Sequence, residues 1–494
     1  MSQPPIAERE SASPAAAPSR PKLSLLDATC IMVGIIIGAS IYESSDEIAE
    51  GASFGSLALV QWLRGESAPP LADSTASAVA IAGIFAVWIV GGIVALVGSL
   101  CYAELSTAFP REGGNYAFLK EAYGSDVGFA FAWVEFWIVR PGNVGAVAFV
   151  FARYAATLLA PWLPALQLPM GQLALACAAI VGLSAVNFLG VRTGTMTQNI
   201  LTASKVLGLL AIVATAFTLV AGPTPNVPPS TRPFQPDLAL ALIFVMFAYG
   251  GWSDMSYVAA EVQNPAKNIS RTLLLGAGMV TAIYLLITWA FLIALSLPGL
   301  RNSSAVAADT MAIRFGVWGA AGISLLICIS TLGAVNGMLF AGSRVFYALG
   351  QEDPAFAWLG AWSQRYGGPV RSLILQAMAT LGLCVVGRSK DGFERLVVFT
   401  APFFWGFLLL IGIGFLLLRS LGRLGHSGYR VPFYPLTPLL LCAACSWMLW
   451  KGAIYAWNNH GVGTYWAFGV LIGGIAVMFV RRWRTGRERN SLAR

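Results

Sequence analysis

Long apolar blocks separated by short polar segments make up most of this chain. A helix needs roughly 20 apolar residues to cross the hydrocarbon core of a bilayer, and about twelve blocks meet or approach that length. The predicted spans are residues 24–48, 78–106, 127–159, 171–187, 197–221, 237–262, 271–297, 317–350, 371–387, 393–419, 434–457 and 464–482. The pattern predicts an all-α polytopic membrane protein.

Two of these spans are interrupted by small residues, Gly34–Ser40 in the first and Phe247–Asp254 in the sixth. In hydrocarbon every backbone amide needs a partner, so an unwound stretch of helix is tolerated only inside protein or beside a watery cavity. Two half-helices that meet at a break offer free N–H groups and free C=O groups, which suit a carboxylate and an amine. The breaks therefore predict a transporter whose site binds a zwitterionic amino acid.

Composition and charge agree with this interpretation. Of the 494 residues, 57% are hydrophobic and 11% are charged, whereas soluble proteins carry about 25% charged residues. The net charge of +8 comes from basic residues in alternate loops and at the C-terminal end, which is the positive-inside pattern and not a nucleic-acid-binding surface. We expect a multi-pass protein of the cell membrane, with a disordered cytoplasmic tail (1–22) and a basic cytoplasmic tail (484–494).

Several short motifs follow one another along the chain. They are Tyr102–Leu105 (YAEL), Phe109–Tyr116 (FPREGGNY), Arg140–Gly142 (RPG), Phe151–Tyr154 (FARY), Val186–Arg192 (VNFLGVR), Phe247–Trp252 (FAYGGW), Glu261–Pro265 (EVQNP) and Ser330–Gly337 (STLGAVNG). Together they resemble the amino acid, polyamine and organocation transporter superfamily, and within it the L-type amino acid transporter branch. The resemblance covers about residues 23–480.

This resemblance implies a LeuT-like core. Ten helices would form two five-helix repeats of inverted topology, with helices 1 and 6 unwound, and two peripheral helices would follow. The expected boundaries are 23–222 for the first repeat, 223–420 for the second and 421–483 for the peripheral helices. An extended loop at about 56–80 is longer than usual in the superfamily, and an outer lid is one role for it.

The resemblance also places the substrate. Amides near Ala39, Ser40 and Ile41 would begin the second half of helix 1 and hold the carboxylate, because a helix N-terminus has unpaired donors. The carbonyl groups that end the first half of helix 6 would bind the ammonium, and Phe247 corresponds to the aromatic gate of the superfamily. The other expected substrate-binding residues are Ile37, Gly38, Ala248, Tyr249, Gly250, Trp252 and Asp254.

The first helix departs from the superfamily pattern. Where Gly-Ser-Gly-Ile-Phe is usual, this chain has Gly-Ala-Ser-Ile-Tyr at residues 38–42. One hydroxyl has moved and one glycine has gained a side chain, which changes the groups around the expected carboxylate site.

Lys205 lies well inside the fifth span, where a charge costs at least ~2.5 kcal/mol. By resemblance it occupies the place where sodium-coupled relatives of the fold bind a cation, and it could bridge helix 5 to the carbonyls around Gly34 and Ile35. We therefore expect transport without sodium. Two roles stay open for Lys205: a fixed structural cation, which we prefer, or a group that exchanges a proton in each cycle.

Other charged residues fall in or near the spans. Glu104, Glu261 and Arg344 lie near the cytoplasmic ends of helices 2, 6 and 8, where contacts that form in one state and break in another could make an inner gate. Glu135 and Arg140 are five residues apart, so they share a helix face only if the helix is distorted, and we expect mutual or interhelical pairing.

The sequence lacks the motifs of other functional classes. It contains no phosphate-binding loop, no hydrolase nucleophile motif and no metal-ligand spacing, so we expect neither an enzyme nor a cofactor. In the L-type branch, heteromeric members join a glycoprotein through a cysteine in the loop after helix 3. Residues 160–171 contain none, so no disulfide-linked subunit is expected.

The leading hypothesis is a sodium-independent secondary transporter of amino acids that works by alternating access, as an exchanger or with proton coupling. Two alternatives remain. An amine or polyamine carrier would fit the altered first helix and Asp254, which would favour cationic or polar side chains if it faces the cavity. A sensor would bind an amino acid without moving it.

Overall fold

The computed structural model describes most of the chain, and both predicted tails lie outside the described part. The described residues are 23–38, 40–65, 69–109, 113–218, 238–303, 306–386, 392–425, 429–458, 467–479 and 481. Within these ranges the protein is helical, and β-structure is limited to isolated bridges between Leu23 and Val262 and between Ser363 and Gly368. The all-α class expected from the apolar blocks is therefore confirmed.

The described helices are named here in chain order. The α-helices are α1 (Leu25–Ile36), α2 (Ser40–Glu43), α3 (Ser45–Arg64), α4 (Asp73–Ala108), α5 (Asn115–Tyr123), α6 (Ser125–Val134), α7 (Arg140–Leu159), α8 (Pro169–Phe188), α9 (Val191–Phe217), α10 (Leu238–Ala248), α11 (Pro265–Asn302), α12 (Val306–Glu352), α13 (Val370–Val386), α14 (Gly392–Ser420) and α15 (Leu436–Asn458). Four further helical segments have non-α geometry. They are the π-helix η1 (Glu135–Val139) and the 3-10 helices η2 (Pro164–Gln167), η3 (Trp252–Glu261) and η4 (Pro354–Gly360).

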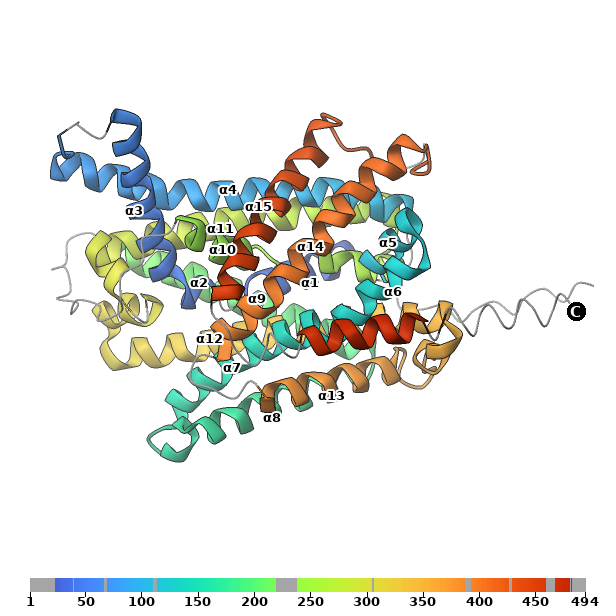
Figure 1. Ribbon diagram of the computed structural model, residues 1–494. Helices are drawn as coiled ribbons and strands as arrows, with labels where there is room; N and C mark the ends of the chain where they lie inside the picture. Colours follow the sequence, from blue (N-terminus) through green and yellow to red (C-terminus); the bar gives the residue numbers. More distant parts are fainter. Residues whose placement is uncertain are drawn as a thin grey trace, which may run out of the picture.

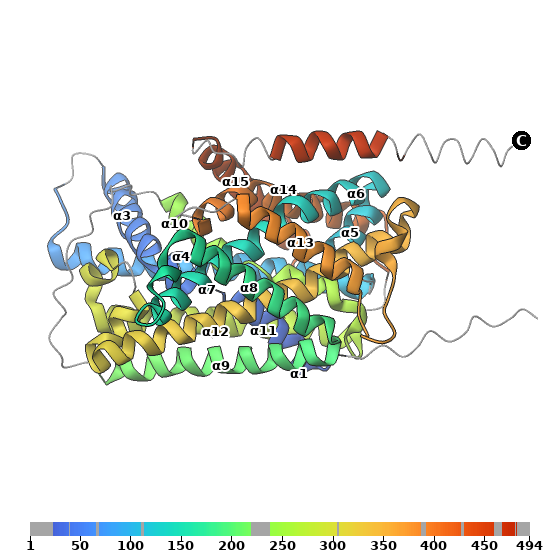
Figure 2. The same ribbon diagram turned by 90° about the horizontal axis from the view of Figure 1, so that it is seen from below.

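In the described part of the chain, ten helices are long and apolar enough to cross a membrane, and the protein is accordingly a multi-pass membrane protein. Two shorter apolar helices, Val370–Val385 and Ala467–Phe479, fall in the ninth and twelfth predicted spans. Figure 2 shows helix 467–479 on one outer side of the molecule, where the Trp133 indole of α6 donates to the Val470 carbonyl, and α9 on the opposite side.

The broken helix α1 lies inside the bundle, where it packs against α9, α11 and α12 (Figure 1). Its capping box explains where it begins: the Ser24 hydroxyl accepts from the Asp27 N–H, and the Asp27 carboxylate accepts from the Ser24 N–H. From Ala28 onward most side chains of α1 are buried. The segment is thus held on all sides by other helices, which is the setting that an unwound stretch requires.

The prediction of a loop at about residues 56–80 is wrong for most of that range, because most of it is helical. Helix α3 continues to Arg64, and α4 already begins at Asp73. Gly65, with φ of 91°, ends α3 in a conformation that glycine adopts readily. Residues 57–63 form a helix from an apolar run too short to count as a span by itself. The hairpin of α3 and α4 projects at one end of the molecule (Figure 1).

Candidate functional site

Both helix breaks predicted from small residues are present, although each is shorter than expected. Helix α1 ends at Ile36 and α2 begins at Ser40, while α10 ends at Ala248 and η3 begins at Trp252. Gly251 has φ of 102°, and a Cβ on it would lie 2.6 Å from a methyl group of Ile35. A glycine is therefore needed where the second break passes against α1.

One tyrosine joins the two breaks. The Tyr284 hydroxyl of α11 is buried and lies 3.1 Å from the Ile36 carbonyl oxygen and 2.9 Å from that of Ala248. Its ring packs against those of Trp88 and Tyr249, at centroid distances of 5.0 Å and 5.2 Å. The chain has 14 tyrosines, and nothing in the sequence distinguishes Tyr284 from the rest.

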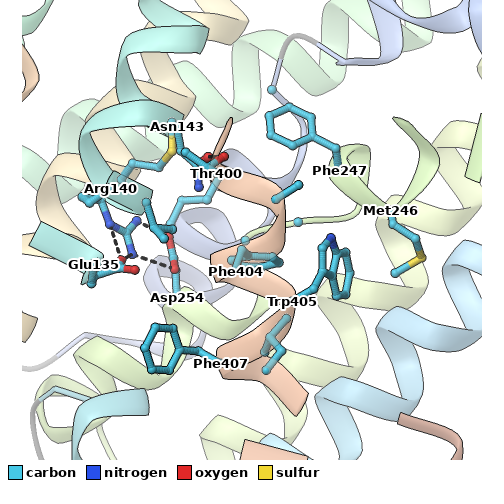
Figure 3. Close-up of a pocket in the computed structure, with 18 of the residues that line it drawn as sticks. Glu135, Arg140, Asn143, Met246, Phe247, Asp254, Thr400, Phe404, Trp405 and Phe407 are labelled. Atoms are coloured by element: carbon cyan, nitrogen blue, oxygen red, sulfur yellow. Dashed lines mark hydrogen bonds and ion pairs between the residues drawn. The ribbon is translucent and has the colours of Figure 1, made fainter. Parts of the chain in front are cut away.

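A cavity opens where the breaks meet. Most of the residues that line it come from four parts of the chain: α1 and α2 at the first break, α10 and η3 at the second break, the segment α6–η1–α7, and α14. They include Ile35, Ile36, Gly38, Ser40, Met246, Phe247, Gly250, Gly251, Asp254, Glu135, Arg140, Asn143, Thr400, Phe404, Trp405 and Phe407. Figure 3 shows the labelled side chains of α10, η3, α7 and α14 gathered around this space. The breaks and the cavity thus form one continuous site.

The expected substrate-binding residues fall into two sets. Those that line the cavity are Gly38, Ser40, Phe247, Gly250 and Asp254. Those that are buried without lining it are Ile37, Ile41, Ala248, Tyr249 and Trp252. Ala39 lies outside the described residues.

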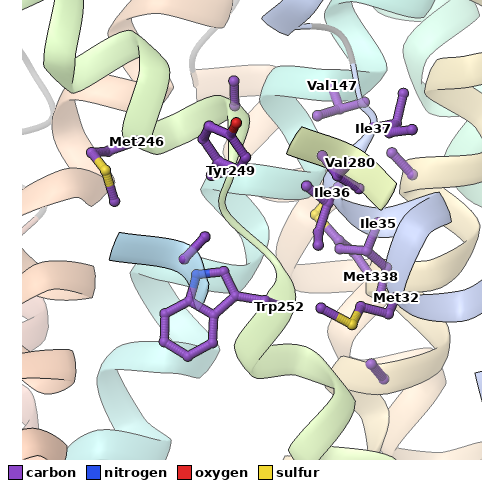
Figure 4. Close-up of a cluster of buried hydrophobic side chains, with 14 of the residues drawn as sticks. Met32, Ile35, Ile36, Ile37, Val147, Met246, Tyr249, Trp252, Val280 and Met338 are labelled. Atoms are coloured by element: carbon purple, nitrogen blue, oxygen red, sulfur yellow. The ribbon is translucent and has the colours of Figure 1, made fainter. Parts of the chain in front are cut away.

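The aromatic rings of the second set are part of the apolar core. Trp252 packs edge-on against Tyr102 at 4.9 Å, and the Tyr249 hydroxyl donates to the Trp88 carbonyl at 3.0 Å. Figure 4 shows Tyr249 and Trp252 among the apolar side chains of helix 1 and its neighbours. Both rings are thus used for packing, and substrate contacts of Tyr249 and Trp252 stay a prediction.

Glu135, Arg140 and Asp254 form a buried charged triad in the cavity wall (Figure 3). The Arg140 Nη1 and Nη2 donate to the two carboxylate oxygens of Asp254 at 2.7 Å and 3.1 Å, and Arg140 Nε donates to Glu135 Oε1 at 2.9 Å. The guanidinium also lies 5.4 Å from the ring centroid of Tyr257. Arg140 therefore pairs both with Glu135 of its own span and with Asp254 of another span.

A π-turn explains the five-residue spacing of the first two. The N–H of Arg140 donates to the carbonyl of Glu135, so the hydrogen bond spans five residues where an α-helix would span four. The turn places both side chains on one face of the third span. The distortion precedes Pro141, whose missing N–H suits this position at the start of α7.

The triad continues into a polar chain toward the segment after α4. The Asn115 side chain of α5 donates to the Tyr257 hydroxyl at 2.9 Å and accepts from the Tyr102 hydroxyl at 2.6 Å. Both tyrosines are fully or almost fully buried. The charged wall of the cavity is thus connected to α4 and α5, which the sequence alone did not predict.

Helix α14 supplies an aromatic wall that the sequence did not identify. Phe404, Trp405 and Phe407 line the cavity, and the Thr400 hydroxyl donates to the Asn143 side-chain oxygen of α7 at 3.1 Å. Figure 3 shows Phe407 on the side of α14 that faces the triad and Trp405 on the side that faces Met246. Twelve per cent of the chain is aromatic, so no sequence signal separates these residues from those that pack or face lipid.

Lys205 of α9 is fully buried beside the first break. Its ammonium donates to the carbonyl oxygens of Gly34, Ile37 and Ser330 at 2.8, 2.6 and 2.9 Å. An ammonium has three protons, so each has an acceptor. The carbonyls of residues 34 and 37 are available because the helix ends at Ile36 and leaves its last carbonyls without helical partners. The expected bridge to the carbonyls around Gly34 and Ile35 is made by the carbonyl of Gly34 and by that of Ile37, the residue directly after α1.

The residues expected at an inner gate form two separate contacts. Arg344 of α12 donates to both carboxylate oxygens of Glu261, at 2.8 Å and 3.4 Å. Glu104 of α4 instead accepts from Arg419 of α14 at 2.8 Å and from the Val431 N–H at 2.6 Å. Glu104 thus lies beside α14 and the segment that follows it, apart from the Glu261–Arg344 pair, and the role of these residues in an inner gate stays a prediction.

The described residues contain no group of three or more His, Cys, Asp or Glu side chains that could hold a metal ion. Both histidines, His426 and His460, lie outside the described residues. The lining of the cavity offers hydrogen-bonding groups and aromatic faces, which suit a small polar organic ligand.

The chain is similar in sequence to known amino acid transporters. The family model described as amino acid permease matches residues 23–477. Large neutral amino acids transporter small subunit 2 of Mus musculus is 32% identical over 372 residues, which are 74% of this chain and 64% of the relative. The chain thus matches slightly less than two thirds of that relative's length. The b(0,+)-type amino acid transporter 1 of Homo sapiens is 28% identical over 83% of this chain and 78% of the relative.

A further relative, Asc-type amino acid transporter 1 of Mus musculus, is 29% identical over 74% of this chain and 65% of the relative. The resemblance to the superfamily and to its L-type branch is confirmed by these matches. The broken helices, the cavity between them and the family match lead to one conclusion: the chain belongs to the amino acid permease family.

Proposed function

We propose that the protein is a sodium-independent secondary transporter of amino acids that works by alternating access. The observation that carries the proposal is the cavity shared by the two helix breaks, because Gly38 and Ser40 of one break and Phe247 and Gly250 of the other line the same space. Membership of the amino acid permease family supports it. The relatives that match are named as amino acid transporters.

In this proposal the substrate carboxylate binds where the second half of helix 1 begins, at the backbone near Ser40. The ammonium binds at the end of α10, at the carbonyls of Phe247 and Ala248. These two oxygens already accept from Gly250 N–H and Tyr284 hydroxyl, and a carbonyl oxygen has a second lone pair for the substrate. Phe247 then acts as the gate above the bound amino acid.

Lys205 takes the role that a sodium ion would otherwise have at the end of α1. Its three hydrogen bonds hold the first break to α9 and to Ser330 of α12. A fixed cation of this kind favours sodium-independent exchange. The alternative mechanism is proton coupling through Lys205. The uptake experiment described below distinguishes exchange from proton coupling.

The proposed architecture keeps the two inverted five-helix repeats, 23–222 and 223–420, followed by peripheral helices in 421–483. It is supported by the equivalent order of elements: the first helix of each proposed repeat is the broken one. We further propose that both termini face the cytoplasm and that the Glu261–Arg344 and Glu104–Arg419 contacts belong to the cytoplasmic gate.

The protein is also proposed to act without a disulfide-linked subunit. The loop between α7 and α8 has no cysteine, and the seven cysteines lie in helices α1, α4, α8, α12, α13 and α15. The amine or polyamine carrier loses part of its motivation, because both oxygens of Asp254 are engaged by Arg140.

The test is uptake of a radiolabelled amino acid mixture into proteoliposomes, with internal amino acids, sodium and the pH gradient varied separately. Uptake in sodium-free buffer that depends on internal amino acids supports exchange. Uptake that depends on the pH gradient supports proton coupling. Uptake of putrescine without any amino acid would favour an amine carrier, and saturable binding with no flux would favour a sensor.

A further inference from the structure

The cavity wall formed by η1, α7 and η3 has more acidic than basic groups. Glu135 and Asp254 lie 2.6 Å and 2.7 Å from the Arg140 guanidinium. Among the residues that line the described cavity, Arg140 supplies the basic side chain and no lysine or histidine accompanies it. With all three side chains ionised, one negative charge has no counter-charge. A buried charge is tolerated when a partner compensates it, so this wall is suited to a ligand that brings a cation.

The two carboxylates are engaged differently. Arg140 binds Asp254 in a bidentate manner, with one guanidinium nitrogen on each carboxylate oxygen. Both of its contacts with Glu135 end on Oε1. Of the four carboxylate oxygens in this wall, Arg140 contacts three. The fourth, Oε2 of Glu135, can accept a hydrogen bond from a ligand. Glu135 itself lines the cavity although its side chain is 4% exposed.

Arg140, by contrast, is already committed. All three of its guanidinium nitrogens donate to Glu135 or Asp254. A ligand with an acidic side chain would have to displace one of these carboxylates and would add a further negative charge to the wall. Charge of this kind sets specificity both by attraction and by exclusion.

We propose that Glu135 is a specificity-determining residue that favours amino acids with a cationic side chain over uncharged ones of the same length and disfavours acidic ones. The inference rests on the proposed function, because it requires the substrate to occupy this cavity. With its main-chain groups at the breaks, the substrate extends its side chain toward Glu135. Phe404 and Trp405 cover the aliphatic stem and present ring faces to the cation.

The test compares lysine with norleucine, which has the same carbon chain without the terminal amine. Each competes with uptake of radiolabelled leucine into proteoliposomes that contain the wild-type protein, and glutamate is the third competitor. Lysine should inhibit at about a tenfold lower concentration than norleucine, and glutamate should be the weakest of the three. Norleucine inhibiting as well as lysine or better would overturn the inference.

The Glu135→Gln variant makes the test specific to this residue. Its amide oxygen can still accept from Arg140 while the excess charge is removed, so the advantage of lysine over norleucine should fall by about tenfold and norleucine should inhibit as before. Glu352→Gln is the matched control, since Glu352 pairs with Lys120 away from the cavity. An unchanged advantage in folded Glu135→Gln protein would contradict the proposal.

The role of Glu135 and the transport activity itself can be rejected separately. Leucine uptake that lysine and norleucine inhibit alike would reject the role of Glu135 and leave the transporter in place. Absence of uptake of every amino acid by folded wild-type protein would reject the proposed function, and the inference with it. The wild-type comparison needs no substitution, so it decides the question even if Glu135→Gln does not fold.

Discussion

The ammonium of Lys205 lies 2.6 Å from the carbonyl oxygen of Ile37, the residue at which α1 has just ended. The same ammonium holds Gly34 in the last turns of that helix and Ser330 on α12. A side chain from α9 thereby fixes the end of one half-helix and the helix packed beside it. The position of the first break depends on this contact.

Replacing Lys205 by Met tests that dependence, because methionine keeps an unbranched stem and removes the charge and the donors. Three buried carbonyls lose a partner, and each unsatisfied buried group costs about 1–3 kcal/mol. We expect uptake to be almost abolished and the melting temperature in detergent to fall. Lys120→Met, at a partly exposed ion pair, is the control. Uptake by Lys205→Met at the wild-type rate would contradict a structural role for this lysine.

Tyr284→Phe removes one hydroxyl from between the two breaks and leaves the ring packing intact. The Ile36 and Ala248 carbonyls lose a shared donor, so we expect a loss of about 1–3 kcal/mol in the free energy of unfolding. The half-maximal substrate concentration should rise several-fold, as pre-organisation of the site is reduced. Thermal unfolding and concentration-dependent uptake measure the two effects. Tyr366→Phe, in a loop, should change neither, and equal behaviour of the two variants would count against the bridge.

Gly251→Ala places a methyl group where the second break approaches α1. The backbone there has φ of 102°, and the new Cβ would lie 2.6 Å from Ile35. Non-glycine residues in such conformations cost about 1–3 kcal/mol. We expect lower thermal stability and much reduced uptake. Gly278→Ala is the comparison, because Gly278 lies in α11 with no neighbour within 4 Å of its Cβ position. A Gly251→Ala protein as stable and active as Gly278→Ala would exclude a requirement for glycine.

The Glu261–Arg344 ion pair is almost completely buried, with side-chain exposures of 0% and 4%. Arg344→Met leaves the Glu261 charge without its partner, and removing one member of a buried pair costs about 3–5 kcal/mol. The double variant Glu261→Gln with Arg344→Met should recover part of this loss. A double-mutant cycle from thermal unfolding measures the coupling. Additive effects of the two substitutions would show that the pair does not act as a unit.

The Glu104–Arg419 ion pair is more exposed than the Glu261–Arg344 pair, so the coupling energies of the two pairs can be compared within one protein. Arg419 is 22% exposed, so water screens its charge more than that of Arg344. The corresponding coupling energy should therefore be smaller. A larger value for Glu104–Arg419 would contradict this ranking by burial.

Features encoded by composition along the chain were predictable from the sequence. The spans follow from apolar length, and the two breaks follow from small residues inside those spans. Lys205 was predicted to have a partner or a function because a lysine inside the membrane costs free energy. These signals are local, so one sequence is enough to read them.

Features that depend on register or on distant segments were not predictable. Tyr284 matters because α11 brings it between two breaks that are far away in the sequence. Glu135 and Arg140 share a face only through a π-turn, which no pattern of residue types specifies. Phe404 and Trp405 resemble any other aromatic pair until α14 is placed beside the cavity.

Sodium-independent transport is tested by uptake of radiolabelled leucine by the purified wild-type protein in sodium-free proteoliposomes, with protein-free liposomes as the reference. We expect saturable uptake above the reference that sodium does not increase. Uptake that occurs only with sodium, or none above the reference from folded protein, would contradict it.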